Sequence, residues 1–294
     1  MDTQTSSKLG PLLRILRFPL VSMLVLYFSL DYVNASGVIF MVTTAKGPVM
    51  PLVVAVLTVA NMLLVYLSFA YFVERRLVSE LALPHMGREL GIGLLIGFGL
   101  MTACILIAMA LGIYHIEGLD SWHNLLPTGV ALSLPFFEEM VFRGIVFRIL
   151  EEKLGSWMAL VLASLVFGSV HMVNGGETLA GVASIALVYG PMLTAPFMLT
   201  RRLSMSIGLH GAWNYTMGKI FSISVSGVAI QGLINASYEG SELLTGGSAG
   251  MEGSLIGIVV GVTATVLMLI LAVRRGNILA PSWKRRIAHP KLDT

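Results

Sequence analysis

The chain has 294 residues, of which 56% are hydrophobic and only 12% are charged, and its mean hydropathy is +0.84. Because soluble globular proteins carry about 25% charged residues, this composition excludes an ordinary soluble domain and indicates a polytopic membrane protein. The basic residues are spread over short loops and tails, where they act as topology signals and contact anionic lipids. We therefore expect membrane lipids, and no nucleic acid, as partners, despite a sequence pI of about 9.1.

Eight apolar stretches approach the roughly 20 residues that a helix needs to cross the hydrocarbon core. The seventh is the weakest, because Gly208, His210, Gly211 and Asn214 interrupt it. We predict an all-α polytopic protein with about eight transmembrane helices, in which residues 1–294 form a single integral-membrane domain. The predicted stretches are Phe18–Phe40, Val49–Phe72, Leu90–Tyr114, Thr128–Leu150, Ser156–Val173, Leu179–Leu199, Ser204–Phe221 and Leu255–Val273.

Lysine and arginine placement predicts the orientation, since cytoplasmic loops carry an excess of these residues. With the N-terminus in the cytoplasm, an eight-span chain places 15 of its 19 Lys and Arg residues in cytoplasmic tails and loops. Lys46 and Lys219 fall outside, and Arg143 and Arg148 fall within a helix. Both termini are therefore predicted to be cytoplasmic. The Gly- and Ser-rich segment 222–254 is predicted to be an extracytoplasmic loop or a re-entrant structure.

Three ionisable residues, Glu138, Glu139 and Arg143, occur within six positions of the fourth stretch. A charged side chain at mid-membrane costs about 2.5–3.5 kcal/mol on insertion scales, so these groups must face a protein interior or a water-filled cavity. Glu139 and Arg143 are four residues apart and can pair on one helical face. Glu138 is rotated away by about 100° and lacks a basic partner on its own face. Glu139 is therefore predicted to be structural and Glu138 to be available for chemistry.

Further polar groups recur in two later stretches. The fifth ends in Phe167-Gly-Ser-Val-His171, and the seventh holds His210-Gly-Ala-Trp-Asn214. An imidazole and a carboxamide on one helical face can donate hydrogen bonds to a developing oxyanion, while His171 can help Glu138 to orient and deprotonate a water. A base, a water-positioning group and oxyanion donors together indicate hydrolysis of a carbonyl compound.

These residues resemble the motifs of the CAAX protease and bacteriocin-processing family, the intramembrane endopeptidases related to the type II CAAX prenyl endopeptidase. The family pattern is EExxxR, FxxxH and HxxxN, in that order. Here it reads Glu138-Glu139-x-x-x-Arg143, Phe167-x-x-x-His171 and His210-x-x-x-Asn214. The resemblance covers about 127–273, including the loop Leu244–Gly253, in which Ala249 and Met251 replace an expected aromatic residue and proline.

The resemblance implies an intramembrane glutamate-type endopeptidase. It implies that Glu138 and His171 activate the attacking water, that His210 and Asn214 form the oxyanion hole, and that Glu139, Arg143 and Phe167 support the site. The implied substrate is a protein or peptide, with or without a lipid modification, and the implied location in a bacterium is the cytoplasmic membrane. No cofactor and no metal are expected.

Two alternatives remain open at this stage. Two histidines, a carboxylate and an asparagine form a set that can also bind zinc, although the chain has no H-E-x-x-H motif. The same buried polar network could instead serve a proton-coupled transporter or a non-catalytic membrane scaffold. Transporters often contain internal repeats with broken helices in matching positions. No such repeat is evident here, and the polar groups gather in the later half of the chain, which favours the enzyme.

Overall fold

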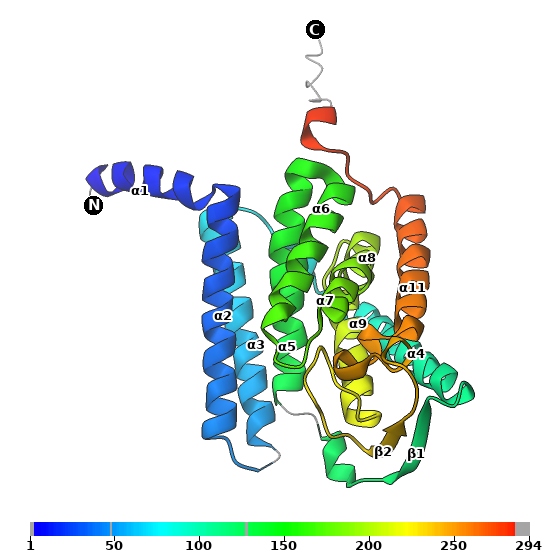
Figure 1. The fold of residues 1–294 in the computed structure, drawn as a ribbon. Helices are drawn as coiled ribbons and strands as arrows, with labels where there is room; N and C mark the ends of the chain where they lie inside the picture. Colours follow the sequence, from blue (N-terminus) through cyan, green and yellow to red (C-terminus); the bar gives the residue numbers. More distant parts are fainter. Residues whose placement is uncertain (1–2, 48, 127–128, 286–294) are drawn as a thin grey trace.

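Each predicted apolar stretch overlaps helical structure in the computed structural model, which describes residues 3–47, 49–126 and 129–285 (Figure 1). Thr128, where the fourth predicted stretch begins, and Pro127, where the family resemblance begins, lie outside the described residues. The helices are α1 (Thr3–Leu16), α2 (Pro19–Thr43), α3 (Met50–Phe69), α4 (Met86–Ala110), α5 (Gly129–Glu139), α6 (Arg148–Val170), α7 (Leu179–Ser184), α8 (Gly190–Thr200), α9 (Ser204–Tyr215), α10 (Glu242–Thr245) and α11 (Leu255–Arg274).

Four π-helical segments continue or connect these helices, and short 3₁₀ turns occur in the loops and after α6. The π segments are η1 (Ala70–Glu74), η4 (Met140–Phe147), η6 (Ile185–Tyr189) and η7 (Thr216–Ile220). The 3₁₀ turns are η2 (Ser79–Leu81), η3 (Trp122–Leu125), η5 (His171–Val173), η8 (Gly247–Gly253) and η9 (Ser282–Lys284).

Six helical runs among the described residues are long and apolar enough to cross a membrane, so the chain is an all-α polytopic membrane protein. The count of eight transmembrane helices stays a prediction, and two features of the structure account for the difference between six runs and eight predicted helices. The run Trp122–Val173 is 52 residues long, but Gly155 interrupts it with a φ of 77°. The seventh predicted stretch forms α9, with 12 residues, and η7, with 5 residues, which together fall short of the length of the six runs.

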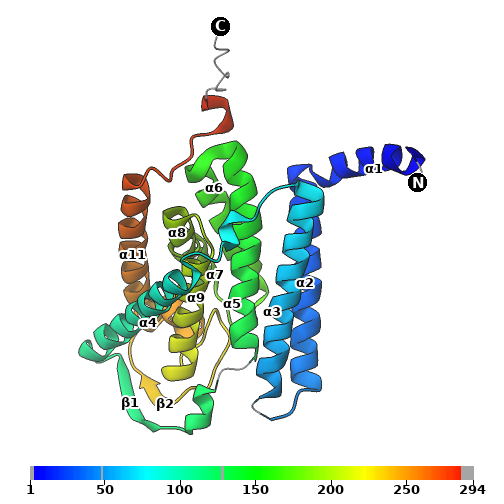
Figure 2. The ribbon, with the colours of Figure 1, turned by 180° about the vertical axis from the view of Figure 1, so that it is seen from behind.

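The break at Gly155 is held by the segment that follows α11. A Cβ at residue 155 would overlap the backbone at Leu279 and Pro281, and the positive φ already favours glycine. Next to the break, the Ser156 amide donates to the Leu279 carbonyl over 3.0 Å, and the Leu279 amide donates to the Ser156 hydroxyl over 2.8 Å. The chain therefore reverses within α6, so that the second part of this helix runs back toward the end of the molecule that holds α5 (Figures 1 and 2).

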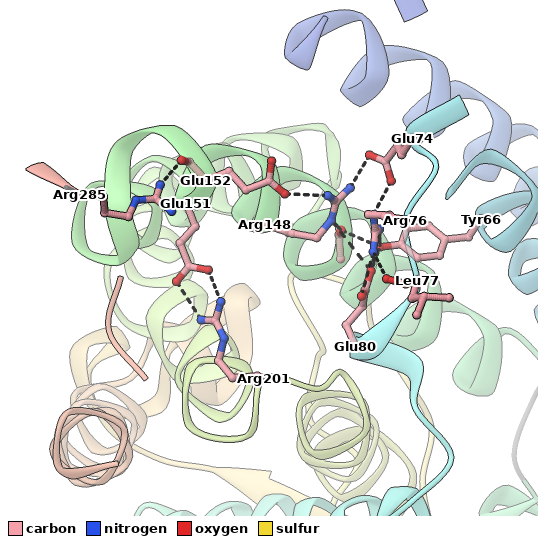
Figure 3. A network of polar contacts seen from close by, with 11 residues as sticks. Tyr66, Glu74, Arg76, Leu77, Glu80, Arg148, Glu151, Glu152, Arg201 and Arg285 are labelled. Carbon is pink, nitrogen blue, oxygen red and sulfur yellow. Dashed lines mark hydrogen bonds and ion pairs between the residues drawn. The ribbon is translucent and has the colours of Figure 1, made fainter. Parts of the chain in front are cut away.

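An ion-pair network fastens the α2–α3 pair to the rest of the molecule (Figure 3). The Tyr66 hydroxyl on α3 donates to the buried Glu80 carboxylate over 2.5 Å and lies 2.8 Å from the Gly144 carbonyl of η4. Arg76 donates to the other Glu80 oxygen over 3.0 Å. Burial alone would raise the pKa of the Glu80 carboxyl, but the hydrogen bonds from Arg76 and Tyr66 outweigh it and hold that pKa below its ordinary value.

A small sheet, absent from the sequence-based prediction, lies at the opposite end of the molecule. Strands β1 (Tyr114–Leu119) and β2 (Ile234–Tyr238) pair antiparallel, with Tyr114 opposite Tyr238 and a register irregularity between Ile116 and Gly118. The segment 222–254 therefore contains a strand, the short helix α10 and the turn η8. The sheet ties this long segment to the end of α4 (Figure 1).

Helix α9, which carries His210 and Asn214, packs directly on the tilted helix α4 through glycines. A Cβ on Gly93 would overlap the Met205 carbonyl, and a Cβ on Gly208 would overlap the Leu90 carbonyl. Small residues permit such backbone contact between membrane helices. The glycine at position 208, which weakened the sequence prediction of a seventh span, is thus what allows α9 to lie against α4.

Candidate active site

Glu138 and Glu139 occupy the last turn of α5 and have different surroundings. The Glu138 side chain is 14% exposed and lines a cavity, whereas Glu139 is completely buried. The π-helical segment η4 begins at the next residue, Met140. π-helical turns within α-helices are rare and frequently mark functional sites, and here the wider turn follows directly on the two carboxylates.

The predicted pair between Glu139 and Arg143 is present. The Arg143 guanidinium donates to Glu139 Oε1 over 2.7 Å, to the Thr194 hydroxyl over 3.2 Å and to the Gly190 carbonyl over 3.1 Å. Its Cζ lies 4.6 Å from the centroid of the Phe167 ring, a distance typical of a cation–π contact. Phe167 therefore supports the arginine as well as packing in the core.

His210 lies between the two glutamates. Its Nδ1 is 2.7 Å from Glu139 Oε1, and its Nε2 is 3.6 Å from Glu138 Oε2. Since an ionised carboxylate accepts and does not donate, Nδ1 is the protonated nitrogen that donates to Glu139. Glu139 thus fixes the orientation of the imidazole as well as pairing with Arg143. The other Glu139 oxygen, Oε2, is buried and has no hydrogen-bond partner among the described residues.

His171 lies at the end of α6, where the helix narrows into the 3₁₀ turn η5. Its Nδ1 is 2.7 Å from the Phe167 carbonyl. A carbonyl oxygen can only accept, so Nδ1 carries a proton and the neutral ring presents an unprotonated Nε2. Because His171 lines the same cavity as Glu138, this tautomer provides a hydrogen-bond acceptor for a water in the cavity.

The cavity has a volume of about 310 Å³ and brings together residues from three predicted stretches. Glu138, His171 and Asn214 line it, together with Asn174, Tyr215 and Lys219. Most of the remaining wall is apolar and comes from the start of α5 and from residues 225–230. The structure therefore places three of the four predicted catalytic side chains on one cavity and places the fourth, His210, against Glu138. The Asn214 side chain makes no hydrogen bond to another described residue.

Glu252 is a buried carboxylate in the 244–253 loop, and the sequence alone predicted no role for it. Its Oε2 accepts from the Ser226 amide over 3.0 Å and from the Ser226 hydroxyl over 2.8 Å. Its Oε1 accepts from the Trp213 indole over 3.3 Å. Asn174 also donates to the Ser226 carbonyl, over 2.9 Å. Glu252 therefore connects a cavity-lining loop to the residue that precedes Asn214. An acid within an otherwise Gly-rich loop was the signal that could have identified it.

No group of three His, Cys, Asp or Glu side chains within the described ranges is arranged to hold a metal ion. Nδ1 of both site histidines faces a protein acceptor, which leaves the Nε2 atoms and Glu138 as the groups that could approach a cation.

The carboxylate and imidazole groups lie at a cavity among apolar helices, and they form a polar site within an integral membrane protein. Residues 125–216 match the family model described as type II CAAX prenyl endopeptidase Rce1-like. All three motifs lie within the matched residues, so the resemblance to the CAAX protease family is confirmed over this part of the chain, and the match points to a protease. No curated protein and no solved structure shows a significant match.

Proposed function

We propose that the protein is an intramembrane endopeptidase in which Glu138 activates water for attack on a peptide bond. One observation carries this proposal: Glu138 faces a cavity, while the neighbouring Glu139 is completely buried and its Oε1 accepts from Arg143 and His210. A general base must be within reach of the water that it deprotonates. Of the two adjacent carboxylates, Glu138 is the one that a water in the cavity can reach.

In the first step, Glu138 takes a proton from a water while the water oxygen attacks the scissile carbonyl carbon. The unprotonated Nε2 of His171 accepts a hydrogen bond from the other O–H of the water, which stays bonded to oxygen, and this orients the oxygen lone pair toward that carbon. The carbonyl π electrons move onto oxygen and form a tetrahedral oxyanion. Asn214 and His210 provide N–H donors for this oxygen, in the manner of an oxyanion hole.

The charges around His210 suit this step. Nδ1 already donates to Glu139, so a second N–H at Nε2 requires the imidazolium form. The resting site then holds two anions, Glu138 and Glu139, and two cations, Arg143 and His210. When Glu138 gains a proton, the negative charge moves to the oxyanion, and the imidazolium that faced Glu138 can stabilise the new anion. Little rearrangement of the protein is needed, which is the advantage of a preorganised site.

In the second step, protonated Glu138 returns its proton to the amide nitrogen. The tetrahedral intermediate collapses, the C–N bond breaks, and the products are a carboxylic acid and an amine. The reaction consumes one water and needs no oxidant, reductant or carrier. The proposed location is an integral position in a membrane, which in a bacterium is the cytoplasmic membrane. The proposed substrate is a protein or peptide, with or without a lipid modification.

The proposal is tested by mapping new protein termini in membranes. Membranes that contain the wild-type protein are compared with membranes that contain an equal amount of folded Glu138→Gln or Glu239→Gln protein. Glu239 is exposed and serves as the matched control. We expect a set of termini that appears with the wild type and the Glu239 variant and is lost with the Glu138 variant. Identical termini in all three membranes would support a non-catalytic scaffold instead.

A further inference from the structure

The two ends of the molecule differ sharply in basic residues. One end gathers the α1–α2 junction, the α3–α4 connection, the reversal within α6, the α8–α9 turn and the segment after α11 (Figures 1 and 3). Arg17, Arg75, Lys153, Arg201 and Arg275 represent these five places. We refer to this as the basic end. Several of its arginines pair with glutamates, among them Arg201 with Glu151 at 2.5 Å.

The opposite end gathers the α2–α3 loop, β1, η3 and β2 (Figures 1 and 2). Among the described residues at this end, Lys46 and Lys219 are the lysines and arginines. Orientation in membranes follows the number of lysines and arginines near the ends of the spans, and acidic residues have little influence on it. The ion pairs at the basic end therefore do not weaken the expectation that this end is cytoplasmic.

The cavity belongs to the opposite end. Its wall includes Val130 near the start of α5, His171 at the end of α6 and Lys219 in the π turn after α9. Residues 225–230 complete the wall, and this loop joins the sheet region: the Asn124 side chain of η3 donates to the Gly232 carbonyl over 2.9 Å, close to the loop. Tyr215, also in the wall, donates to the Leu125 carbonyl of η3 over 2.5 Å.

Three apolar residues of the cavity wall are exposed, and we refer to them as the mouth of the cavity. Leu134 on α5 is 37% exposed, Val170 on α6 is 38% exposed, and Val228 in the loop is 52% exposed. Leu134 and Val170 lie on helices within runs that are long and apolar enough to cross a membrane, where an exposed apolar side chain can face lipid. Val228 lies in the connection beyond the helices. The cavity can thus be entered from the bilayer and from the surface beside the sheet.

From these positions we infer that the active-site cavity opens on the extracytoplasmic side, toward the outer leaflet. The substrate class that fits is a polypeptide segment at or just outside the outer leaflet, with apolar side chains that fill the cavity wall. A segment presented from the cytoplasm would meet the basic end and not the wall of the cavity. This inference rests on the proposed function only in taking the occupant of the cavity to be a polypeptide.

Cysteine labelling tests the inference without any measurement of hydrolysis. The native Cys104 is buried on α4 and should give no background. Val228→Cys and the matched control Lys153→Cys are each produced in a bacterial host and exposed to a membrane-impermeant sulfonated maleimide, in spheroplasts and in inside-out vesicles. We expect Val228→Cys to react only in spheroplasts and Lys153→Cys only in inside-out vesicles. The reverse pattern, or equal labelling of Val228→Cys from both sides, would overturn the inference.

A second experiment tests whether the substrate reaches the site through the mouth of the cavity. Once the mapped termini provide a substrate, spheroplasts with Val228→Cys are treated with a bulky impermeant maleimide before the substrate is produced. External modification should lower cleavage at least tenfold, while spheroplasts with the wild type or Lys153→Cys should be unaffected. If labelling is one-sided as expected but no cleavage exists in any sample, the proposed function fails and the orientation stands. Full cleavage by externally modified Val228→Cys would contradict access through this mouth.

Discussion

Glu139 accepts a hydrogen bond from Nδ1–H of His210 over 2.7 Å, although 71 positions separate the two residues in the chain. The same oxygen accepts from Arg143. The second glutamate of the pair therefore holds the imidazole that the first glutamate faces. Because Glu138 and Glu139 make different contacts, we expect different results when each of them is replaced.

Glu139→Gln should lower the stability and the folded yield of the protein. It leaves Arg143 in a dry interior without its counter-ion, and breaking a buried pair costs about 3–5 kcal/mol. Thermal unfolding in detergent measures the loss. In the double variant with Arg143→Gln, the combined loss should be smaller than the sum of the single losses, because the two residues are coupled. Strictly additive losses would show that the pair is not coupled energetically.

Sequence reasoning could predict interactions within one helix but not between helices. The four-residue spacing predicted the Glu139–Arg143 pair, and hydropathy predicted the helices, because both depend on local geometry. The contact of Glu139 with His210 depends on how α5 and α9 pack. The position of α9 depends in turn on its contact with α4, which glycines such as Gly208 allow. The contact of Glu252 with Ser226 likewise depends on the path of a long loop. The roles given to the motif residues stay predictions, since geometry shows proximity and not turnover.

Stability should depend on pH through Glu80. Its folded pKa is lower than the ordinary value of 4.5, so the ionised carboxylate contributes stability above about pH 4.5, and this contribution is lost as the pH falls through the folded pKa. Glu80→Gln should therefore unfold at a lower temperature than the wild type at pH 7. The difference should shrink in acid, where both side chains are neutral. A difference that stays constant from pH 7 to pH 3 would contradict this role.

Glu252→Gln should weaken substrate binding more than it slows chemistry. Glutamine has a single, uncharged acceptor oxygen, so its NH₂ must face either the Ser226 donors or the Trp213 N–H. In either orientation the cavity-lining loop loses a charge-assisted hydrogen bond worth about 1.5–3 kcal/mol. At about 1.4 kcal/mol per tenfold change, we expect KM to rise about 10- to 100-fold with kcat nearly unchanged. Glu242→Gln, on the exposed helix α10, is the matched control. A fall in kcat at unchanged KM would indicate a role in the reaction itself.

Asn214 distinguishes an oxyanion hole from a zinc site. If its amide donates to the oxyanion, Asn214→Ala should lower turnover by about 10²–10³, and Asn214→Asp should not restore it, because a negative charge would face the oxyanion. If zinc is bound instead, the aspartate should preserve or tighten metal binding. Metal analysis of the purified protein and a chelator titration separate the cases. Zinc near one per chain, lost together with activity, would contradict the glutamate mechanism.

The central claim, that Glu138 is the base of an intramembrane peptidase, is tested most directly by turnover of purified protein in lipid nanodiscs. The substrate is a peptide that spans a mapped cleavage site, and wild type and Glu138→Gln are compared at equal amounts of folded protein. Removal of a general base lowers the rate by about 10²–10⁴, so Glu138→Gln should bind the peptide with unchanged affinity and cleave it at least 100-fold more slowly. Cleavage by Glu138→Gln at the wild-type rate would contradict the account.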